Sequence, residues 1–346
     1  MTFAVAGRYV WDFWTVRDGE TTHLFYLNAP RDIPHPDDRH GLAVIGHATS
    51  ADLRDWTDLG DCLGPSAKPA WDDGTTWTGC TIRRPDGQWM MFYTGTTRQG
   101  GINLQRIGAA VSSDLHTWTK LPQNPLLVTD PRWYEHYDFA ATGERPWHDE
   151  AWRDPWVYAD PGGKGWRMLF TAREKHGPDK GRGVIAEATS PDLITWTAGP
   201  PFFRIGYFGE MEVPQLFQIG DWWYCLFCNG ARNQAPNYLP RSGAPRMSGT
   251  HYLRSRSPGG PFEMVEDRFL AGDPAWSLYA GRMVPGKSDQ LYLMCFLNEL
   301  PEGGFGGTLS DPMPIWQLPD GRLRADTRAY GIPVSDEDLA FMPCGR

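Results

Sequence analysis

The chain has 346 residues, of which 40% are hydrophobic, and this length and composition suit one large domain with a substantial core. Its formal net charge of −9 and its lack of a Lys/Arg run argue against a nucleic-acid-binding protein, which needs a basic face for phosphate. No stretch of about 18 apolar residues occurs, so we expect no membrane-spanning helix.

The N-terminal segment and the cysteines do not indicate a secreted protein. Residues 1–8 lack the basic start and apolar core of a secretory signal, which predicts a cytoplasmic location. Six cysteines in so long a chain do not suggest a disulfide framework. Cys225 and Cys228 would point to opposite faces of one strand, which disfavours a metal or redox pair. We predict no cofactor and no metal, and the sequence does not fix the number of subunits.

Five aromatic-rich runs predict buried strands. Each is short, rich in β-prone residues and bordered by Gly, Asp or Asn. In chain order the runs cover residues 23–27, 89–93, 166–170, 222–227 and 291–296.

A second pattern follows the first three runs. Residues 46–57, 108–119 and 185–197 share the sequence Ser-x-Asp-Leu-x-x-Trp, and residues 252–262 are a degenerate copy. Each copy predicts a strand, a tight turn and a short outer strand whose Trp or Phe packs between neighbours. A repeat of roughly 40–50 residues built this way predicts an all-β, single-domain, five-bladed β-propeller. A β-sandwich would also show many short strands, but it gives no reason for the turn to repeat.

The predicted blades leave room for long loops between strands. Residues 28–44, 61–76, 130–149 and 230–248 are expected to build the rim of a pocket. Five aromatic side chains in these loops are either sugar-stacking platforms or ordinary loop packing: Trp71, Trp133, Tyr134, Trp147 and Tyr238. The blades are approximately residues 8–60, 75–122, 150–200, 210–265 and 278–320, with a C-terminal tail that closes or caps the ring.

Three acidic residues occupy the same point of three repeated units. Asp12 lies in Trp11-Asp12-Phe13-Trp14, Asp154 in Arg153-Asp154-Pro155, and Glu212 in Glu212-Val213-Pro214. Each precedes its aromatic run by a similar interval, as do Trp77 and Arg282 in the other two units. All five therefore fall on the first strand of a blade, and first strands line the central channel of a propeller.

Carboxyl groups that converge on one channel suggest an enzyme acting on sugars. Glycoside hydrolysis needs one carboxylate that attacks or activates water, and one carboxyl group that protonates the leaving oxygen. The apolar neighbours of Glu212 favour a raised pKa, whereas Arg153 would keep Asp154 ionised. Glu210 competes with Glu212 for the acid role, because residues i and i+2 share one face of a strand.

These motifs resemble those of glycoside hydrolase families 32 and 68. The Asp12 motif resembles the nucleophile motif of levansucrase-like enzymes, and Trp77-Thr78-Gly79-Cys80 resembles Trp-Ser-Gly-Ser. The Asp154 motif matches Arg-Asp-Pro, and the Glu212 motif resembles that of the acid/base. The resemblance covers roughly residues 8 to 300. It implies a retaining hydrolase or transglycosylase acting on β-fructofuranosides, with Asp12 as nucleophile, Glu212 as acid/base and Asp154 as transition-state stabiliser.

The sequence departs from the family pattern at two positions and at its C-terminal end. Trp11 stands where invertases usually have Asn, and Val213 stands where Cys or Arg follows the acid/base. The residues after 300 are too few for the C-terminal β-sandwich common in family 32. The expected ligand is an oligosaccharide or small sugar, and its candidate contacts are Trp11, Trp14, Trp77, Thr78, Arg153, Glu210, His251 and Arg282.

Three other hypotheses stay open at this point. Families 43 and 62 also bring two Asp and one Glu to a five-bladed channel, but they invert. Their carboxyl groups would lie roughly 6.5–9.5 Å apart, against about 5–5.5 Å in a retaining enzyme. Mannoside phosphorylases of family 130 need phosphate ligands, for which Arg282 and His251 are the nearest candidates. A non-catalytic carbohydrate-binding propeller needs no acid/base pair, so the three acidic residues argue against it.

Overall fold

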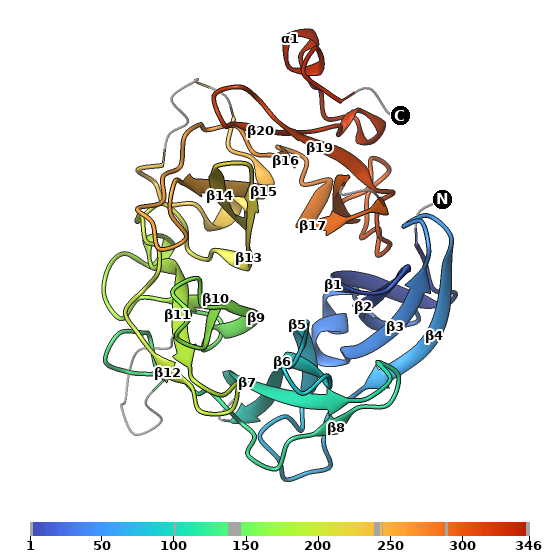
Figure 1. The fold of residues 1–346 in the computed structure, drawn as a ribbon, viewed down its shortest axis with the longest axis vertical. Coiled ribbons are helices and arrows are strands. Elements are labelled where there is room, and N and C mark those ends of the chain that lie inside the picture. Colours follow the sequence, from blue (N-terminus) through green and yellow to red (C-terminus); the bar gives the residue numbers. More distant parts are fainter. Residues whose placement is uncertain are drawn as a thin grey trace.

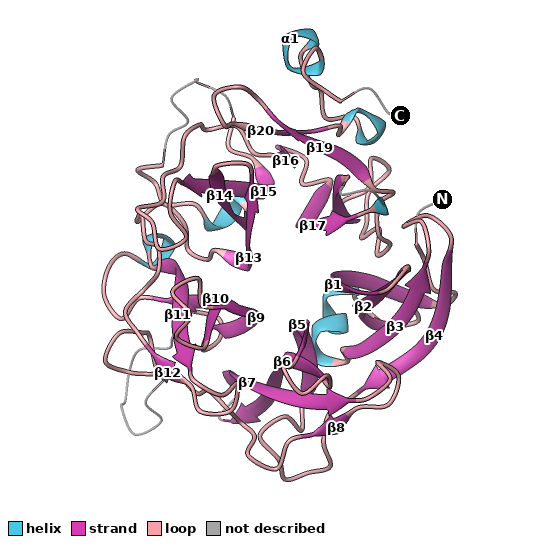
Figure 2. Ribbon diagram, in the orientation of Figure 1, coloured by secondary structure: helices cyan, strands magenta, loops and turns pink. Residues whose placement is uncertain are grey.

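The computed structural model describes residues 3–99, 102–137, 147–238, 243, 245–287 and 290–343. Within these residues, five four-stranded antiparallel sheets surround a central axis, each with its strands in sequence order from the inside outwards (Figure 1). Figure 2 shows that strands and loops make up almost all of the ring. The predicted all-β, five-bladed propeller is confirmed.

Each blade is built from four consecutive strands. Blade 1 contains β1 (Arg8–Asp18), β2 (Thr21–Pro30), β3 (Val44–Ser50) and β4 (Trp56–Leu63). Blade 2 contains β5 (Thr75–Arg83), β6 (Trp89–Gln99), β7 (Ile102–Ser112) and β8 (Thr119–Lys120). Blade 3 contains β9 (Trp152–Ala159), β10 (Trp166–Arg173), β11 (Gly183–Ser190) and β12 (Thr197–Ala198). Blade 4 contains β13 (Glu212–Ile219), β14 (Trp222–Asn229), β15 (Ser248–Ser255) and β16 (Ala271–Asp273). Blade 5 contains β17 (Leu278–Pro285), β18 (Leu291–Leu297), β19 (Met313–Gln317) and β20 (Leu323–Ala325).

The helices are short. Those that lie wholly within the described residues are the 3-10 turns η1 (Pro36–Gly41), η2 (Asp179–Gly181), η3 (Ala231–Asn233) and η5 (Arg328–Tyr330), and the α-helix α1 (Asp336–Leu339). Among the described residues, none of these is long and apolar enough to cross a membrane.

The five aromatic runs form the second strands β2, β6, β10, β14 and β18. Second strands lie between two neighbours of their own sheet and between the faces of adjacent blades, so their side chains are buried. Phe25, Phe92, Phe170 and Phe227 have no exposed surface. Cys225 and Cys228 lie on β14 as buried free thiols.

The repeated Ser-x-Asp-Leu-x-x-Trp sequence forms the same hydrogen-bonded turn in blades 1, 2 and 3. In blade 2, Ser112 Oγ accepts from the main-chain N–H of Leu115 at 2.9 Å, and Asp114 Oδ1 accepts from those of His116 and Thr117. Trp118 Nε1 then donates to the carbonyl of Leu115 at 3.1 Å. The turn leucines Leu53, Leu115 and Leu193 all adopt left-handed φ values, of 65°, 64° and 70°. The sequence repeats because the turn needs each of these donors and acceptors.

The degenerate fourth copy folds differently. It lacks the turn aspartate, and the outer strand of blade 4 begins only at Ala271, beyond the predicted limit of residue 265. Phe262 packs instead against Phe202 of the preceding segment, with ring centroids 5.0 Å apart. An aromatic side chain therefore still fills the space between blades 3 and 4.

The N-terminal segment reaches blade 5, which the C-terminal part of the chain completes (Figure 1). The main-chain N–H of Leu309 donates to the carbonyl of Phe3 at 2.9 Å, which joins the N-terminal segment to blade 5. The C-terminal residues supply β19 and β20, and Trp316 Nε1 then donates to the Asp338 carbonyl of α1. The C-terminal segment thus completes the last blade.

Candidate active site

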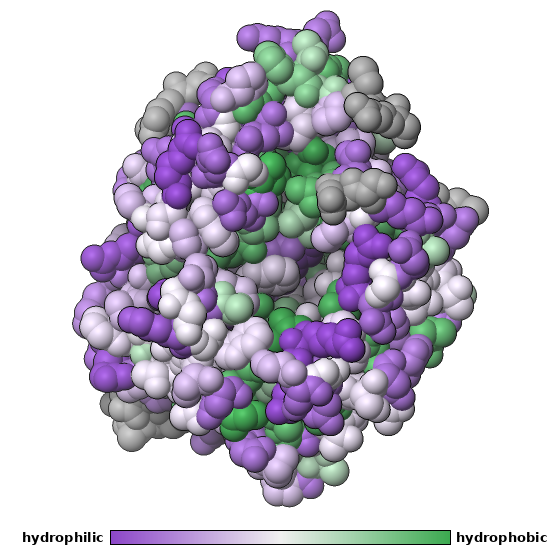
Figure 3. Space-filling view, in the orientation of Figure 1, coloured by the Kyte–Doolittle hydropathy of each residue, from purple (hydrophilic) through white to green (hydrophobic). Residues whose placement is uncertain are grey.

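Each of the five inner strands carries a register irregularity, and the predicted site residues lie at these points. Because a β-bulge re-aims side chains and bends its strand, five of them around one axis turn side chains into a common channel. Figure 3 shows a hollow at the centre of this face of the molecule. The irregularities fall between Val10 and Phe13, Trp77 and Gly79, Leu169 and Thr171 (facing Asp154), Glu212 and Gln215, and Tyr279 and Arg282.

Backbone strain concentrates at three of these bulges. Asp154, Val213 and Ala280 have φ values of 62°, 55° and 49°, in a region that non-glycine residues rarely occupy. Each such residue costs roughly 1–3 kcal/mol unless its surroundings enforce it. Here Thr94 Oγ1 accepts from the N–H of Asp154 at 3.0 Å, and Asp154 Oδ2 accepts from the N–H of Val213 at 3.2 Å. The strain is therefore held in place by contacts between blades 2, 3 and 4.

Asp12 lies half-buried on β1. Its Oδ2 accepts a 2.5 Å hydrogen bond from Thr78 Oγ1 of β5, so the two predicted site residues are in direct contact. Burial and the nearby negative charge of Asp154 raise the pKa of Asp12 to about 6, although the Thr78 hydrogen bond and the Arg282 charge lower it. Above that pH, Asp12 offers an ionised carboxylate to the channel.

Glu212 has a higher pKa than Asp12. Its side chain is 21% exposed, its Oε1 accepts from Arg153 Nη2 at 2.8 Å, and its Oε2 accepts from Tyr279 Oη. Burial and the charge of Glu210 raise its pKa to about 7, against the lowering effects of Arg153 and Tyr279. A general acid at neutral pH needs this property.

Glu210 has the opposite environment. Its side chain is 4% exposed and lies 2.7 Å from Arg153 Nη2 and 3.4 Å from His148 Nε2, while Asn233 Nδ2 donates to it at 3.0 Å. Burial raises the pKa of Glu210, but Arg153 and His148 lower it further, so the net pKa falls well below its usual range. Glu210 is thus suited to remain an anion, which favours Glu212 over Glu210 as the acid.

Asp154 is enclosed by hydrogen-bond donors. Its Oδ2 accepts from Thr171 Oγ1 at 2.7 Å and from the N–H of Val213, and Arg153 Nε lies 3.6 Å away. Arg153 therefore contacts Asp154, Glu210 and Glu212 together. One guanidinium thereby fixes three carboxyl groups from blades 3 and 4.

Arg282 is buried between the inner strands of three blades. It is 1% exposed, and its Nη1 donates to the carbonyls of Pro214 at 2.9 Å and Val213 at 3.3 Å. Its Nε donates to the carbonyl of Phe13 at 3.3 Å. These bonds join the inner strands of blades 1, 4 and 5, and the sugar contact predicted for Arg282 stays a prediction.

The η1 turn forms part of the wall. Trp77 Nε1 donates to the carbonyl of His40 at 2.9 Å, and the ring of Trp11 meets His40 edge-on at 6.0 Å. Arg39 lies 5.6 Å from the Trp11 ring. Sequence reasoning placed Trp11 and Trp77 here but missed Arg39, His40 and Tyr279. Tyr279 was accessible to it, because it lies on the predicted inner strand of blade 5 close to Arg282.

Two candidate sugar contacts lie in the protein interior instead of the channel. Trp14 is 1% exposed, donates from Nε1 to Thr81 Oγ1 and stacks on Phe25. His251 is fully buried on β15, the third strand of its blade, and stacks on Phe227. Both of its ring nitrogens already bond to the main chain, at Tyr252 and Glu266. A sugar or phosphate contact would require these bonds to break, so the structure does not favour that role for Trp14 or His251.

The five loop aromatics differ in how far their rings are buried or covered by other side chains. Tyr134 and Tyr238 are buried, and Trp71 packs on Tyr93 at 5.6 Å. Trp147 is covered on one face by Arg173 at 4.1 Å. Only Trp133 of this set is exposed.

One group of side chains has the spacing of a metal site. Ligand atoms of His148, Asp149 and Glu210 lie within 4.8 Å of one another. However, the Arg153 guanidinium is bonded to Glu210 and lies 3.9 Å from Asp149, so a positive charge already occupies this position. A divalent cation would be repelled there. The absence of a metal remains a prediction.

Comparison with known proteins relates the chain to sugar-cleaving enzymes. The family model described as the N-terminal domain of glycosyl hydrolases family 32 matches residues 16–241, which is more than half of the chain and includes Asp154 and Glu212. A fructan 6-exohydrolase of Beta vulgaris is 30% identical over 206 residues, covering 57% of this chain and 30% of the relative. A β-fructofuranosidase of Arabidopsis thaliana, insoluble isoenzyme CWINV5, is 31% identical over 207 residues, covering 57% of this chain and 31% of that protein. The matched region thus spans about a third of the length of these relatives.

Solved structures share the fold. An inulosucrase from Halalkalicoccus jeotgali bound to kestose has a TM-score of 0.70 and 21% identity, covering 93% of this chain and 87% of that one. A levansucrase from Gluconacetobacter diazotrophicus has a TM-score of 0.71 and 18% identity, covering 94% and 82%. At these identities the likeness supports the fold alone, whereas the family match rests on the sequence. The chain belongs to glycosyl hydrolases family 32.

Proposed function

We propose that the protein is a retaining glycoside hydrolase that cleaves β-fructofuranosides, with water or a second sugar as the acceptor. One observation carries the proposal. Asp12 and Glu212 come from the bulges of different inner strands, and their raised pKa values of about 6 and about 7 suit a nucleophile and an acid at near-neutral pH.

The proposed mechanism follows from the environments of Asp12 and Glu212. Asp12, ionised and held by Thr78, attacks the anomeric carbon of the fructosyl unit while Glu212 protonates the departing glycosidic oxygen. The resulting fructosyl ester on Asp12 is then attacked by water or a sugar hydroxyl, whose proton returns to Glu212. Asp154 is proposed to accept hydrogen bonds from fructosyl hydroxyls and to stabilise the positive charge that develops in both transition states.

Other channel residues have supporting roles in this proposal. Arg153 orients Glu210 and Glu212, and Tyr279 orients Glu212 through its second oxygen. Trp11, Trp77 and Thr78 are proposed to contact the sugar from the side of the η1 turn. A cytoplasmic location and the absence of nucleic-acid and membrane partners also remain predictions.

The names of the relatives support a fructoside over the other hypotheses. They include a fructan 6-exohydrolase and several β-fructofuranosidases, and one structural neighbour holds kestose. These names do not favour an arabinosidase, a mannoside phosphorylase or a non-catalytic propeller.

The test is sugar release from sucrose, inulin, levan and an aryl arabinofuranoside. We expect fructose from at least one of the first three and no release from the last. Release only from the arabinofuranoside, or from none of the four, would overturn the proposed function.

A further inference from the structure

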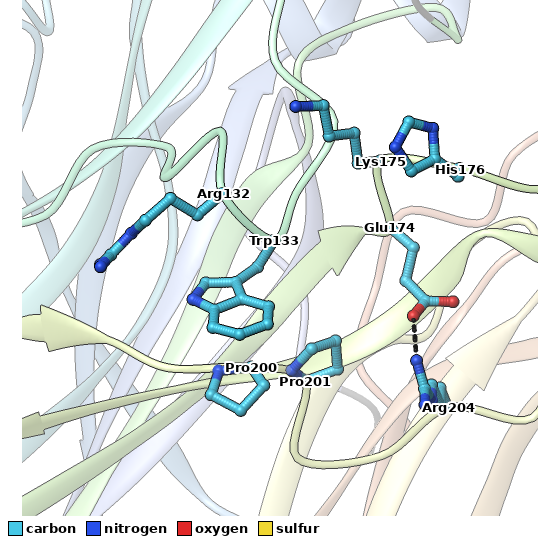
Figure 4. A pocket seen from close by; sticks show the side chains of 8 residues that line it. All are labelled: Arg132, Trp133, Glu174, Lys175, His176, Pro200, Pro201 and Arg204. Atoms are coloured by element: carbon cyan, nitrogen blue, oxygen red, sulfur yellow. Dashed lines mark hydrogen bonds and ion pairs between the residues drawn. The ribbon is translucent and has the colours of Figure 1, made fainter.

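A separate pocket lies at one end of blade 3. It has a volume of about 510 Å³, and its lining includes Trp133, Pro200, Pro201, Arg132, Glu174 and Arg204 (Figure 4). None of the channel carboxylates contributes to it. This volume lies within the usual range for small-ligand sites, roughly 300–1,000 Å³.

Trp133 is the unusual residue of this pocket. All 17 tryptophans lie in the described part of the chain, and Trp133, at 42%, is the one that is exposed. Trp147 and Trp222 have a ring face covered by an arginine, at 4.1 and 4.3 Å. Trp133 instead lies beside Pro200 and Pro201, with open space next to its indole (Figure 4). An exposed indole has a large apolar face that water solvates poorly, so it favours a ligand with a flat apolar face.

The position of Trp133 is fixed by its neighbours. Its main-chain N–H donates to the carbonyl of Asp130 at 3.2 Å, and its carbonyl accepts from Lys175 N at 3.3 Å. The adjacent Tyr134 is fully buried, and its hydroxyl donates to the carbonyl of Gly199, next to Pro200, at 2.8 Å. The indole and the two prolines are therefore held together before any ligand binds, which lowers the entropic cost of binding.

The polar lining presents both donors and acceptors to the open space, among them Lys175. Arg132 pairs with Asp130 at 2.6 Å, and Arg204 pairs with Glu174 at 3.1 Å. Lys175 Nζ donates to the carbonyl of Pro131 at 3.1 Å. Both guanidinium groups have carboxylate partners, whereas the Lys175 ammonium has a carbonyl partner, so the lining offers cationic donors as well as carboxylate acceptors. Hydroxyl groups of a neutral ligand can donate to the carboxylates and accept from the guanidinium groups beside the indole.

The pocket lies at the end of blade 3 that carries Arg153. Ala172 of β10 pairs with Trp152, the neighbour of Arg153, and Glu174 follows directly after β10. Pro200 follows β12, the outermost strand of the same blade. The main chain of Trp133 instead pairs with the extension of β10 on the side of the inner strand β9, because Lys175 N donates to its carbonyl whereas Glu174 N donates to Arg182 on the β11 side. A polymer of several sugar units would therefore reach both sites.

We propose that this pocket is an accessory binding site for one sugar unit of a neutral polysaccharide, with the apolar C–H face of the ring on Trp133 and its hydroxyls on the charged pairs. The choice of a fructan as that polysaccharide rests on the proposed function. The pocket holds the polymer near the enzyme and takes no part in bond cleavage.

The test separates polymer binding from turnover. Binding of levan and inulin is measured by affinity electrophoresis in an Asp12→Asn background, which prevents cleavage, and sucrose hydrolysis is measured with Asp12 intact. Trp133→Ala is compared with Phe341→Ala, a second exposed aromatic that is 49% accessible. We expect Trp133→Ala to weaken binding of at least one polymer about tenfold and to leave sucrose hydrolysis unchanged, with no effect of Phe341→Ala on either.

The outcomes distinguish this proposal from the proposed function. Unchanged polymer binding in Trp133→Ala, or no binding of either polymer by the parent protein, overturns the accessory site. Loss of polymer binding in Trp133→Ala in a protein that cleaves no fructoside supports the accessory site and overturns the proposed function alone. An equal loss of sucrose hydrolysis in Trp133→Ala would place Trp133 in the catalytic site and contradict the accessory role.

Discussion

The outer turns and the inner bulges of the propeller both contain residues with left-handed φ values, but different kinds of contact stabilise them. In the outer turns, Leu53, Leu115 and Leu193 adopt left-handed φ values, and local Ser and Asp side chains satisfy the surrounding main-chain donors. At the inner bulges, Asp154 and Val213 adopt similar φ values but depend on contacts from other blades.

The difference lies in what each region does with its carboxylates. Asp114 and Asp192 accept main-chain hydrogen bonds that lower the pKa of each to about 2, so they are anions that stabilise their turns. Burial raises the pKa of Asp12 and Glu212, so their ionised forms are costly. The outer carboxylates thus stabilise the fold in their ionised form. The inner carboxyl groups destabilise the fold when they ionise, but their raised pKa values suit them to catalysis.

The largest expected effect concerns the two inner carboxyl groups. Asp12→Asn and Glu212→Gln should each lower kcat at least about 10³-fold, because each removes a group that takes part in the chemistry. The unfolding midpoint should not fall, since a neutral amide avoids the cost of a buried charge. Steady-state kinetics and thermal unfolding check this, with Asp18→Asn, at the exposed end of β1, as the matched control. Near-native kcat in either variant would refute the assignment.

The second expected effect is a bell-shaped dependence of kcat/KM on pH. Activity requires ionised Asp12, so it should fall as the pH drops below about 6. It also requires protonated Glu212, so it should fall as the pH rises above about 7. A profile of kcat/KM against pH reports these groups in the free enzyme. A flat profile between pH 5 and pH 8, roughly one unit beyond each limit, would contradict the assignment.

Two substitutions should move the basic limb in opposite directions. Tyr279→Phe removes a hydrogen bond to Glu212 and should raise its pKa, so activity should persist to higher pH. Glu210→Gln removes a neighbouring negative charge and should lower the pKa of Glu212, so activity should be lost at lower pH. If both variants moved the basic limb in the same direction, Tyr279 and Glu210 would not have opposite effects on the pKa of Glu212, and this account of the site would be wrong.

The smallest expected effect concerns the outer turns. Asp114→Ala removes the acceptor for two main-chain N–H groups and should lower the free energy of unfolding by roughly 1 kcal/mol without changing kcat. Denaturant unfolding measures the loss, and Asp192→Ala should behave alike because its turn has the same bonds. A loss of kcat in Asp114→Ala would contradict the claim that the outer turns contribute to stability and not to catalysis.

The sequence predicted the features that repeat and missed those that depend on distant contacts. The five aromatic runs and the Asp-Leu turns are local patterns, so they identified the propeller and the inner strands. Thr78 was placed beside the carboxylates by its motif, but its bond to Asp12 joins residues of different blades. The sharing of Arg153 by Glu210 and Glu212, and the role of Tyr279, likewise arise only when separate strands meet.

Aromatic residues were harder to assign. Trp14 follows Asp12 closely in the sequence, yet the bulge that begins after Val10 turns it between blades 1 and 2. The burial of His251 follows from its place on a third strand, which no motif revealed. Among the loop aromatics, exposure separates Trp133 from the others, and exposure depends on how the loops pack.

The stereochemistry of fructosyl transfer tests the central claim most directly. With sucrose in aqueous methanol, attack by Asp12 followed by methanol gives two inversions, so the first methyl fructofuranoside formed should have the β configuration by NMR. A crystal structure should then show the Asp12 and Glu212 carboxyl groups about 5–5.5 Å apart. A first product of α configuration would mean a single displacement and would contradict the role of Asp12 as nucleophile.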